Sequence, residues 1–148
     1  TGRVIREATL DDVPALVEMG MRFAQSDAYN QVLRDNPVQI EQMARMLITS
    51  AVGFMLVLEK AGHIEGMIGM LCTPHFLSGD MFAGEICWWV NPEHRGDGVR
   101  LMRSAESLAH TRGATTIQMV APDERVGRFY ERLGYRRIDT SYQKRCEA

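Results

Sequence analysis

The chain has 148 residues, of which 45% are hydrophobic and 24% charged, and its formal net charge is −2. These values are ordinary for a globular protein, and we expect residues 1–148 to form one domain. The sequence has no apolar run of about 20 residues and no signal-peptide pattern at its start, and it is acidic overall. We therefore expect a cytoplasmic protein with no membrane or nucleic-acid partner.

The first half of the chain predicts two helices and three strands. We expect strands at 3–8, 53–60 and 65–72 and helices at 11–24 and 37–50. Thr9 is a suitable N-cap for the first helix, and Asn36 followed by Pro37 is a typical start for the second. Residues 53–72 predict an antiparallel hairpin, in which Gly66 and Gly69 indicate a close backbone approach or a bulge.

The second half alternates strands with helices. We expect a loop at 73–80, strands at 82–90 and 115–121, helices at 98–111 and 122–134, and a final strand at 135–145. The strand–helix–strand unit at 82–121 requires a right-handed crossover between parallel strands. The order β-α-α-β-β-β-α-β-α-β with an antiparallel hairpin therefore predicts an α/β fold with a mixed sheet.

Cysteine and histidine residues point to no special chemistry. The cysteines, Cys72, Cys87 and Cys146, have no CxxC spacing, and the histidines form no HExxH pattern. We expect Cys72 and Cys87, which lie in apolar stretches, to be buried free thiols. We expect no bound metal.

Charge is unevenly distributed along the chain. Residues 1–90 contain 6 Lys and Arg against 11 Asp and Glu, whereas residues 91–148 contain 11 against 8. The C-terminal part can therefore receive an anion and the N-terminal part can favour a cation. From the charge counts alone, a mixed-charge surface without a ligand is the favoured interpretation.

The stretch HRGDGVRLMR at 94–103 combines glycines and arginines between a strand and a helix. A helix start offers unpaired N–H groups and a positive dipole end, and glycines let an anion approach the backbone. The stretch contains neither GxxxxGK[ST] nor GxGxxG. These residues alone fit a phosphate site or a plain turn.

A wider pattern resembles a known family. VNPEHRGDGVRLM (90–102) resembles the acyl-CoA motif V-x-P-x-x-[QR]-x-x-G-x-[GA] of the GNAT superfamily of N-acetyltransferases. Arg95 and Gly98 occupy motif positions, but Arg100 stands where the family prefers Gly or Ala. DERVGRFYERLGYRR (123–137) is similar to N-x-x-A-x-x-[FL]-Y-x-x-x-G-[FY], with Asp123 in place of Asn and Tyr130 at the Tyr position.

The resemblance implies a mostly antiparallel sheet with helices on both faces and splayed parallel strands around residues 82–90 and 115–121. Acetyl-CoA is then the co-substrate, and family members are often dimers, so a homodimer is compatible with this reading. The residues implied to contact acetyl-CoA are Trp89, Val90, Arg95, Gly96, Asp97, Gly98, Val99, Arg100, Asp123 and Tyr130. Trp89 and Val90 would pair with pantetheine, and the amides from Arg95 to Arg100 would hold the pyrophosphate. We expect the Arg100 side chain to contact a phosphate as well.

The implied reaction is direct attack of a primary amine on the thioester. Tyr130 is the candidate proton donor to the leaving thiolate, since a phenol is protonated at neutral pH. Glu85, a carboxylate in the apolar stretch FAGEICWWV, is the candidate base. A core tyrosine, a structural or substrate-binding carboxylate, and a water relay are the alternatives. Alternation places Glu85, Cys87 and Trp89 on one face and Ile86, Trp88 and Val90 on the other.

The acceptor is less well defined. The acidic first half suggests a cationic small-molecule or peptide amine, met by the loops at 25–36 and 73–80. Asp27, Tyr29, Asp35 and Asp80 are candidates in these loops. One of Trp88 and Trp89 is expected to pack against a helix and the other to line the cleft. A catalytically inactive acyl-CoA-binding or regulatory domain is the alternative function, and an unrelated nucleotide-phosphate binder is a third.

Overall fold

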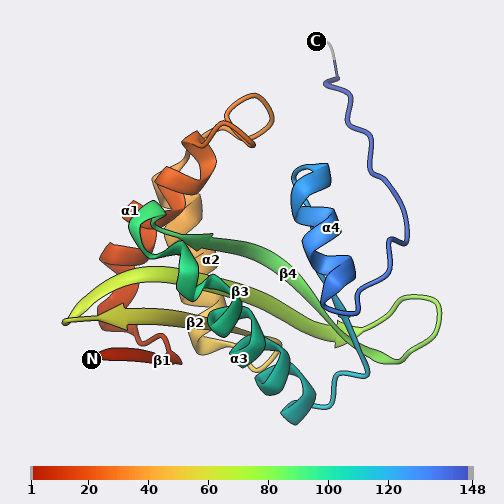
Figure 1. The fold of residues 1–148 in the computed structure, drawn as a ribbon, viewed down its shortest axis with the longest axis horizontal. Coiled ribbons are helices and arrows are strands. Elements are labelled where there is room, and N and C mark those ends of the chain that lie inside the picture. The colour runs from red at the N-terminus through yellow and green to blue at the C-terminus, as the bar shows by residue number, and fades with distance from the viewer. Residues whose placement is uncertain (1, 147–148) are drawn as a thin grey trace.

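The computed structural model describes residues 2–146 and has the expected mixed α/β architecture (Figure 1). In chain order the elements are β1 (Arg3–Glu7), the 3₁₀ helix η1 (Leu10–Asp12), α1 (Val13–Gln25), α2 (Pro37–Thr49), β2 (Gly53–Lys60), β3 (His63–Pro74), β4 (Met81–Val90), the 3₁₀ helix η2 (Pro92–Asp97), α3 (Gly98–Thr111), β5 (Thr116–Gln118) and α4 (Glu124–Arg132). The sequence-based bounds agree for most elements, although β5 is much shorter than the strand expected at 115–121.

The five strands form one sheet in the order β1-β2-β3-β4-β5. All neighbours are antiparallel except β4 and β5, which are parallel and joined through α3. Helices α1 and α2 cover one face, where Leu16 and Leu47 join a core cluster with Met67. Helices α3 and α4 cover the other face, where Leu101 and Tyr130 belong to a second cluster (Figure 1).

Local sequence signals set the helix ends. The Asn36 side chain accepts a hydrogen bond from the Gln39 N–H at 3.2 Å and caps α2. Gly113 and Gly134 follow α3 and α4 with φ of +92° and +96°, a conformation that glycine adopts without steric cost. These caps confirm the helix boundaries expected from the sequence.

Gly69 allows α2 to lie close to the sheet. A Cβ atom at this position would lie 2.8 Å from Leu47 Cδ1 and 3.3 Å from Cys87 Sγ. Both neighbours belong to the packed core, so a larger residue would displace them. The close approach expected at this glycine is confirmed.

The strand expected at 135–145 is not formed, which corrects the final element of the predicted order. Residues 133–146 contain no strand and extend away from the sheet beyond α4 (Figure 1). The apolar side chains Ile138 and Tyr142 remain 62% and 93% exposed. Two separated apolar side chains in a polar segment bury too little surface to offset the ordering of a strand, and β5 offers only a short edge.

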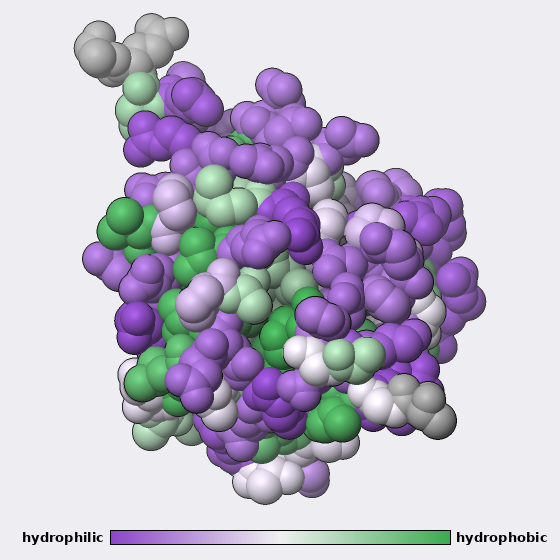
Figure 2. Space-filling model, turned by 90° about the vertical axis from the view of Figure 1, so that its left-hand side faces the viewer, coloured by the Kyte–Doolittle hydropathy of each residue, from purple (hydrophilic) through white to green (hydrophobic). Residues whose placement is uncertain are grey.

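The thiols are as expected: Cys72 and Cys87 are buried, Cys146 is exposed, and all three are free. No helix among the described residues is both long and apolar enough to cross a membrane. On the face shown in Figure 2, hydrophilic residues dominate and hydrophobic ones appear in small groups.

Candidate active site

The two parallel strands separate at Glu85. Strand β5 pairs with β4 only at positions 82–84 of β4, opposite 116–118. Strand β4 continues to Val90, whereas β5 ends at Gln118. Beyond this point the Glu85 side chain, rather than the β4 backbone, accepts the Val120 N–H at 3.0 Å. The splay implied around residues 82–90 and 115–121 is therefore present, and Glu85 lies where it begins.

A β-bulge at Ile86 determines where Glu85 points. The β3–β4 register pairs Gly69 with Cys87 and Met70 with Glu85, which leaves Ile86 as the extra residue on β4. Cross-strand partners share a face of a sheet. Met70 belongs to the core under α3, whereas Cys87 belongs to the core under α1 and α2.

The predicted alternation along β4 is therefore wrong at Glu85. The bulge shifts the phase by one residue, so Glu85 shares the α3–α4 face with Trp88 rather than the opposite face with Cys87 and Trp89. Bulges commonly re-aim side chains in this way beside active sites. The carboxylate consequently lies on the same face as Tyr130.

Burial tunes the Glu85 carboxylate for proton transfer. Desolvation raises its pKa from 4.5 to about 7, and the hydrogen bond from Val120 N–H partly opposes this rise because it favours the charged form. A carboxylate with a pKa near neutrality is partly ionised at pH 7 and can accept a proton reversibly. The chemistry required of a general base is therefore available at this position.

Tyr130 lies across from Glu85 on α4. Its side chain is buried, and its O–H donates to the Val120 carbonyl at 3.1 Å. Burial, followed by the negative charge of Glu85, raises the Tyr130 pKa well above its ordinary value of 10. The phenol therefore keeps its proton throughout the neutral and mildly alkaline range, as a proton donor must.

The 3₁₀ helix η2 (Pro92–Asp97) leads directly into α3. The Arg95 Nε–H donates to the Val90 carbonyl at 3.0 Å, and its guanidinium lies 4.8 Å from the Trp89 ring centroid. Arg95 thus holds the end of β4 against the start of the helix. Its remaining N–H groups can still meet an anion beside Val90.

Asp97 is directed toward β1. Its buried carboxylate forms an ion pair with Arg3, which ties the start of α3 to the edge strand. This contact accounts for an acidic residue in a segment expected to receive phosphate. Only the backbone of Asp97 is then suited to an anion.

The two glycines of this segment differ: Gly96 is exposed, whereas Gly98 is buried and its N–H donates to the Arg95 carbonyl. A Cβ atom on Gly96 would meet nothing within 4 Å, and one on Gly98 would lie no closer than 3.5 Å to Trp88 Cζ2. Gly98 has φ of −61°, which any residue adopts. Neither packing nor backbone conformation therefore requires glycine at these two positions. The pyrophosphate contact expected for the amides from Arg95 to Arg100 stays a prediction.

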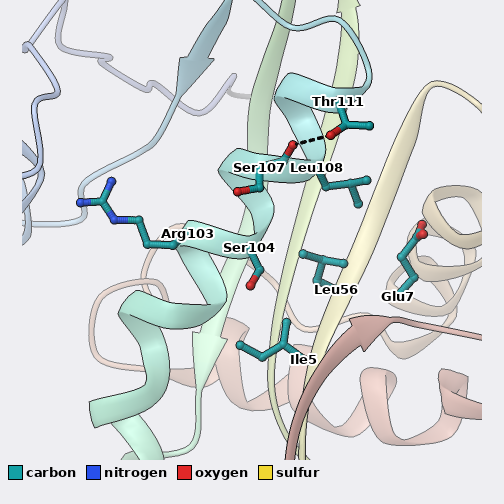
Figure 3. Close-up of a pocket in the computed structure, with 8 residues that line it drawn as sticks. All are labelled: Ile5, Glu7, Leu56, Arg103, Ser104, Ser107, Leu108 and Thr111. Atoms are coloured by element: carbon teal, nitrogen blue, oxygen red, sulfur yellow. Dashed lines mark hydrogen bonds between the residues drawn. The ribbon is translucent and has the colours of Figure 1, made fainter.

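Arg100 lies on the side of α3 that faces β1. It is exposed and lines a shallow hollow with Arg3 and Val99. An adjoining groove of about 490 Å³ runs between α3 and the strands β1 and β2 (Figure 3). Its lining residues are Ile5, Glu7, Leu56, Arg103, Ser104, Ser107, Leu108 and Thr111. The parted strands lie on the other side of α3, so the phosphate contact expected for Arg100 stays a prediction.

Asp123 is the N-cap of α4. Its carboxylate accepts the Val126 N–H at 2.9 Å, and the residue is exposed. An aspartate caps a helix as well as the asparagine that the family prefers. This contact explains the residue locally, and its expected contact with pantetheine stays a prediction.

An aromatic cluster connects the segment between α1 and α2 with β4. Tyr29 stacks on Phe23 with 4.6 Å between ring centroids, and Phe23 packs edge-on against Trp89 at 6.5 Å. Burial raises the pKa of Tyr29, and the negative charges of Glu85 and Asp123 add to this effect. Tyr29 is therefore within electrostatic range of Glu85, and its ring contacts lead through Phe23 to Trp89.

The remaining acceptor candidates, Asp27, Asp35 and Asp80, are exposed. Asp35 accepts a hydrogen bond from the Gln25 side chain at 2.7 Å, and Asp27 is exposed. Asp80 belongs to the β3–β4 loop, where Phe76 and Leu77 are fully exposed. Tyr29 is packed against Phe23, whereas these three acids are exposed loop residues.

A polar cluster at the end of β4 was missed in the sequence analysis. The buried Asn91 side chain accepts from Trp89 Nε1 at 3.1 Å and from Arg22 at 3.2 Å, and it donates to Glu65 at 2.9 Å. These partners come from α1, β3 and β4, so no local pattern could reveal them. The cluster fixes the Trp89 ring and the chain direction into η2.

A family model described as the acetyltransferase (GNAT) family matches residues 19–135. The match covers most of the chain and includes Glu85, the segment at 90–102 and Tyr130. The chain belongs to the GNAT acetyltransferase family. Among residues 2–146 no cluster of three or more His, Cys, Asp or Glu side chains is arranged to hold a metal ion.

Solved structures share the fold over nearly the whole chain. A transcriptional regulator from Bacillus halodurans C-125 is 24% identical with a TM-score of 0.80, covering 97% of this chain and 99% of that chain. A ribosomal-protein-alanine N-acetyltransferase from Brucella melitensis biovar Abortus 2308 is 19% identical with a TM-score of 0.76, covering 99% and 100%.

An aminoglycoside acetyltransferase from an uncultured soil metagenomic sample is 18% identical with a TM-score of 0.74, covering 99% of this chain and 100% of that chain. At these identities the similarity establishes the fold alone. No curated protein sequence matches the chain.

Proposed function

We propose that this acetyltransferase moves an acetyl group from acetyl-CoA to a primary amine by direct attack in a ternary complex. The observation that carries the proposal is the meeting of Glu85 and Tyr130 at Val120, where β4 and β5 part. A base with a pKa of about 7 and a phenol that keeps its proton are the two groups that the reaction needs. The proposed enzyme is cytoplasmic, as the composition suggests, and uses no metal.

In the proposed reaction Glu85 takes a proton from the ammonium form of the acceptor, directly or through one water. The neutral amine attacks the thioester carbonyl carbon, forming a C–N bond and a tetrahedral intermediate. The attacking nitrogen, which is positively charged in the intermediate, releases its second proton to solvent. Collapse of the intermediate breaks the C–S bond, and Tyr130 gives its proton to the departing thiolate. Glu85 returns its proton through solvent, and Tyr130 is reprotonated from solvent.

The proposed acetyl-CoA site runs from the start of α3 to Tyr130. The exposed backbone at Gly96 and the guanidinium of Arg95 suit the diphosphate. The β4 backbone at Trp89 and Val90 suits the pantetheine amides, because β5 no longer pairs with it there. The thioester would then lie between Glu85 and Tyr130.

The proposed acceptor is a cationic small-molecule or peptide amine. Glu85 supplies negative charge at the opening, and Tyr29 and Phe23 supply aromatic surface beside it. Ring faces and carboxylates both attract ammonium groups. Two structural neighbours are named for a ribosomal-protein alanine and for aminoglycosides, so a peptide N-terminus and an aminoglycoside belong in the first acceptor panel with a polyamine.

The deciding experiment is release of CoA thiol from acetyl-CoA across this panel, with Glu85→Gln and Tyr130→Phe beside the parent protein. Turnover by the parent that falls in both variants supports the proposal. Release that is independent of every amine, or equal in all three proteins, contradicts the proposed mechanism.

A second candidate is a catalytically inactive acyl-CoA-binding or regulatory domain. The observations that favour it are the departures from the family motif, since Asp123 caps α4 and Arg100 faces β1. Binding of CoA with no turnover on any amine would support this alternative. Thermal stabilisation by CoA separates both candidates from a protein that does not bind CoA.

A further inference from the structure

The two neighbouring tryptophans of β4 differ in the hydrogen bonding of their indole N–H groups. Trp89 Nε1–H is bonded to the Asn91 side chain at 3.1 Å. Trp88 Nε1 is buried and has no hydrogen-bond partner. No other buried side-chain nitrogen or oxygen among residues 2–146 lacks one. A buried donor left unpaired loses its hydration without compensation, so such a group calls for a physical reason.

The Trp88 ring extends between the two ends of the proposed acetyl-CoA site. Its centroid lies 6.1 Å from that of Tyr130 and 6.5 Å from that of Phe129, with interplanar angles of 27° and 26°. At its other edge, Cζ2 would lie 3.5 Å from a Cβ atom on Gly98. One indole therefore joins the start of α3 to the tyrosine of α4.

CoA has its diphosphate and its thiol at opposite ends of the pantetheine arm. If the diphosphate lies at Gly98 and the thiol at Tyr130, that arm must pass the indole that reaches both residues. The arm carries two amide carbonyls between apolar methylene groups. An indole N–H can only donate, and an amide carbonyl is the acceptor that the arm offers.

We propose that Trp88 is a binding residue for acyl-CoA, whose indole N–H donates to a pantetheine carbonyl. The inference rests on the proposed function, because it needs CoA as the ligand. It adds a side-chain contact to the backbone contacts of β4. It also accounts for the unpaired donor, because the ligand supplies the acceptor that the protein lacks.

The test compares Trp88→Phe with Trp89→Phe. Phenylalanine keeps an aromatic ring at each site and removes only the N–H and part of the ring. Without CoA, each substitution removes part of a packed ring and should lower the melting temperature, but Trp88→Phe loses no protein hydrogen bond in addition. Trp89→Phe should melt lower, because the buried Asn91 carbonyl loses a donor.

Calorimetry then measures the affinity for CoA and for adenosine 3′,5′-bisphosphate, which lacks the pantetheine arm. Trp88→Phe should weaken CoA binding by about three- to tenfold and leave the affinity for the bisphosphate unchanged. Equal CoA affinity in the parent and Trp88→Phe overturns the inference.

A second measurement observes the parent protein, in which both tryptophan rings are intact. The chain has two tryptophans, so indole ¹⁵N labelling gives two N–H signals that the two variants assign. CoA should move the Trp88 proton signal downfield and slow its exchange with solvent. An unmoved Trp88 signal in a protein that binds CoA overturns this inference alone, whereas no binding of CoA to the parent overturns the proposed function and the inference together.

Discussion

Glu85 and Tyr130 bind the same residue from two different elements. The Glu85 carboxylate accepts the Val120 N–H at 3.0 Å, and the Tyr130 phenol donates to the Val120 carbonyl at 3.1 Å. Val120 follows the last residue of β5 by two positions, so this segment connects the proposed base with the proposed acid. Because both groups are held at Val120, we expect substitutions of either one to change the proton transfers of the proposed reaction.

Glu85→Gln should lower kcat/KM by about 10²- to 10⁴-fold if the carboxylate is the general base. In the parent, kcat/KM should rise through a pH of about 7, following ionisation of Glu85. The variant should lose this step and retain only the ionisation of the amine. Rates of thiol release between pH 5.5 and 9 test this. If the variant keeps the rise in kcat/KM near pH 7, a group other than Glu85 is responsible for it.

Glu85→Gln should also stabilise the protein at alkaline pH. Burial raises the pKa of Glu85 from 4.5 to about 7, so in this window the native state holds a proton that the unfolded chain has released. The stability of the parent therefore falls as pH rises through the window, and the neutral amide is free of this effect.

We expect the variant to gain on the order of 1–3 kcal/mol in free energy of unfolding relative to the parent at pH 8. The difference should be small at pH 4.5, where the carboxyl is mostly protonated in the native state. Urea denaturation at both pH values measures it, and a constant difference would contradict the raised pKa.

Tyr130→Phe should lower kcat by about 10²- to 10⁴-fold, because the thiolate must then leave without a proton donor. The KM for acetyl-CoA should change little, since the ring is retained. The raised pKa also predicts that the parent shows no loss of activity from phenol ionisation up to a pH of about 10. Steady-state kinetics with the parent and the variant measure both effects.

Gly98→Ala should separate ligand binding from stability. The added methyl group makes only ordinary contacts, with Trp88 and Val90 at 3.5 and 3.6 Å, and the backbone is already helical. The unliganded variant should be stabilised by about 0.4–1 kcal/mol. Binding of CoA should weaken at least tenfold if the diphosphate meets this backbone. Calorimetric affinity beside the melting temperature measures both, and equal affinity would place the diphosphate elsewhere.

Asp123 offers a matched pair of variants. Asp123→Ala removes the cap of α4 and should cost about 1 kcal/mol of stability, whereas Asp123→Asn should preserve it. If the residue serves only as a cap, Asp123→Asn should keep the KM for acetyl-CoA of the parent. A clear fall in that KM would show that the family's asparagine makes a contact that Asp123 does not.

Local signals in the sequence determined most of the architecture. The hairpin, the crossover and the four main helices follow from apolar periodicity, N-caps such as Asn36, and glycines such as Gly113. The family motifs located Tyr130 and the start of α3, because each motif lies within one contiguous segment of the sequence. Glu85 was recognisable because a carboxylate in an apolar strand needs a partner or a cleft.

Only the tertiary structure decided which way the residues of β4 point. The bulge at Ile86 arises from the pairing of β4 with β3, and one extra residue moves Glu85 to the opposite face. The hydrogen bonds of Glu85 and Tyr130 to Val120, and the unpaired N–H of Trp88, likewise join segments distant in sequence. Alternation is a property of one strand, whereas register and buried hydrogen bonding depend on neighbours that a single segment does not contain.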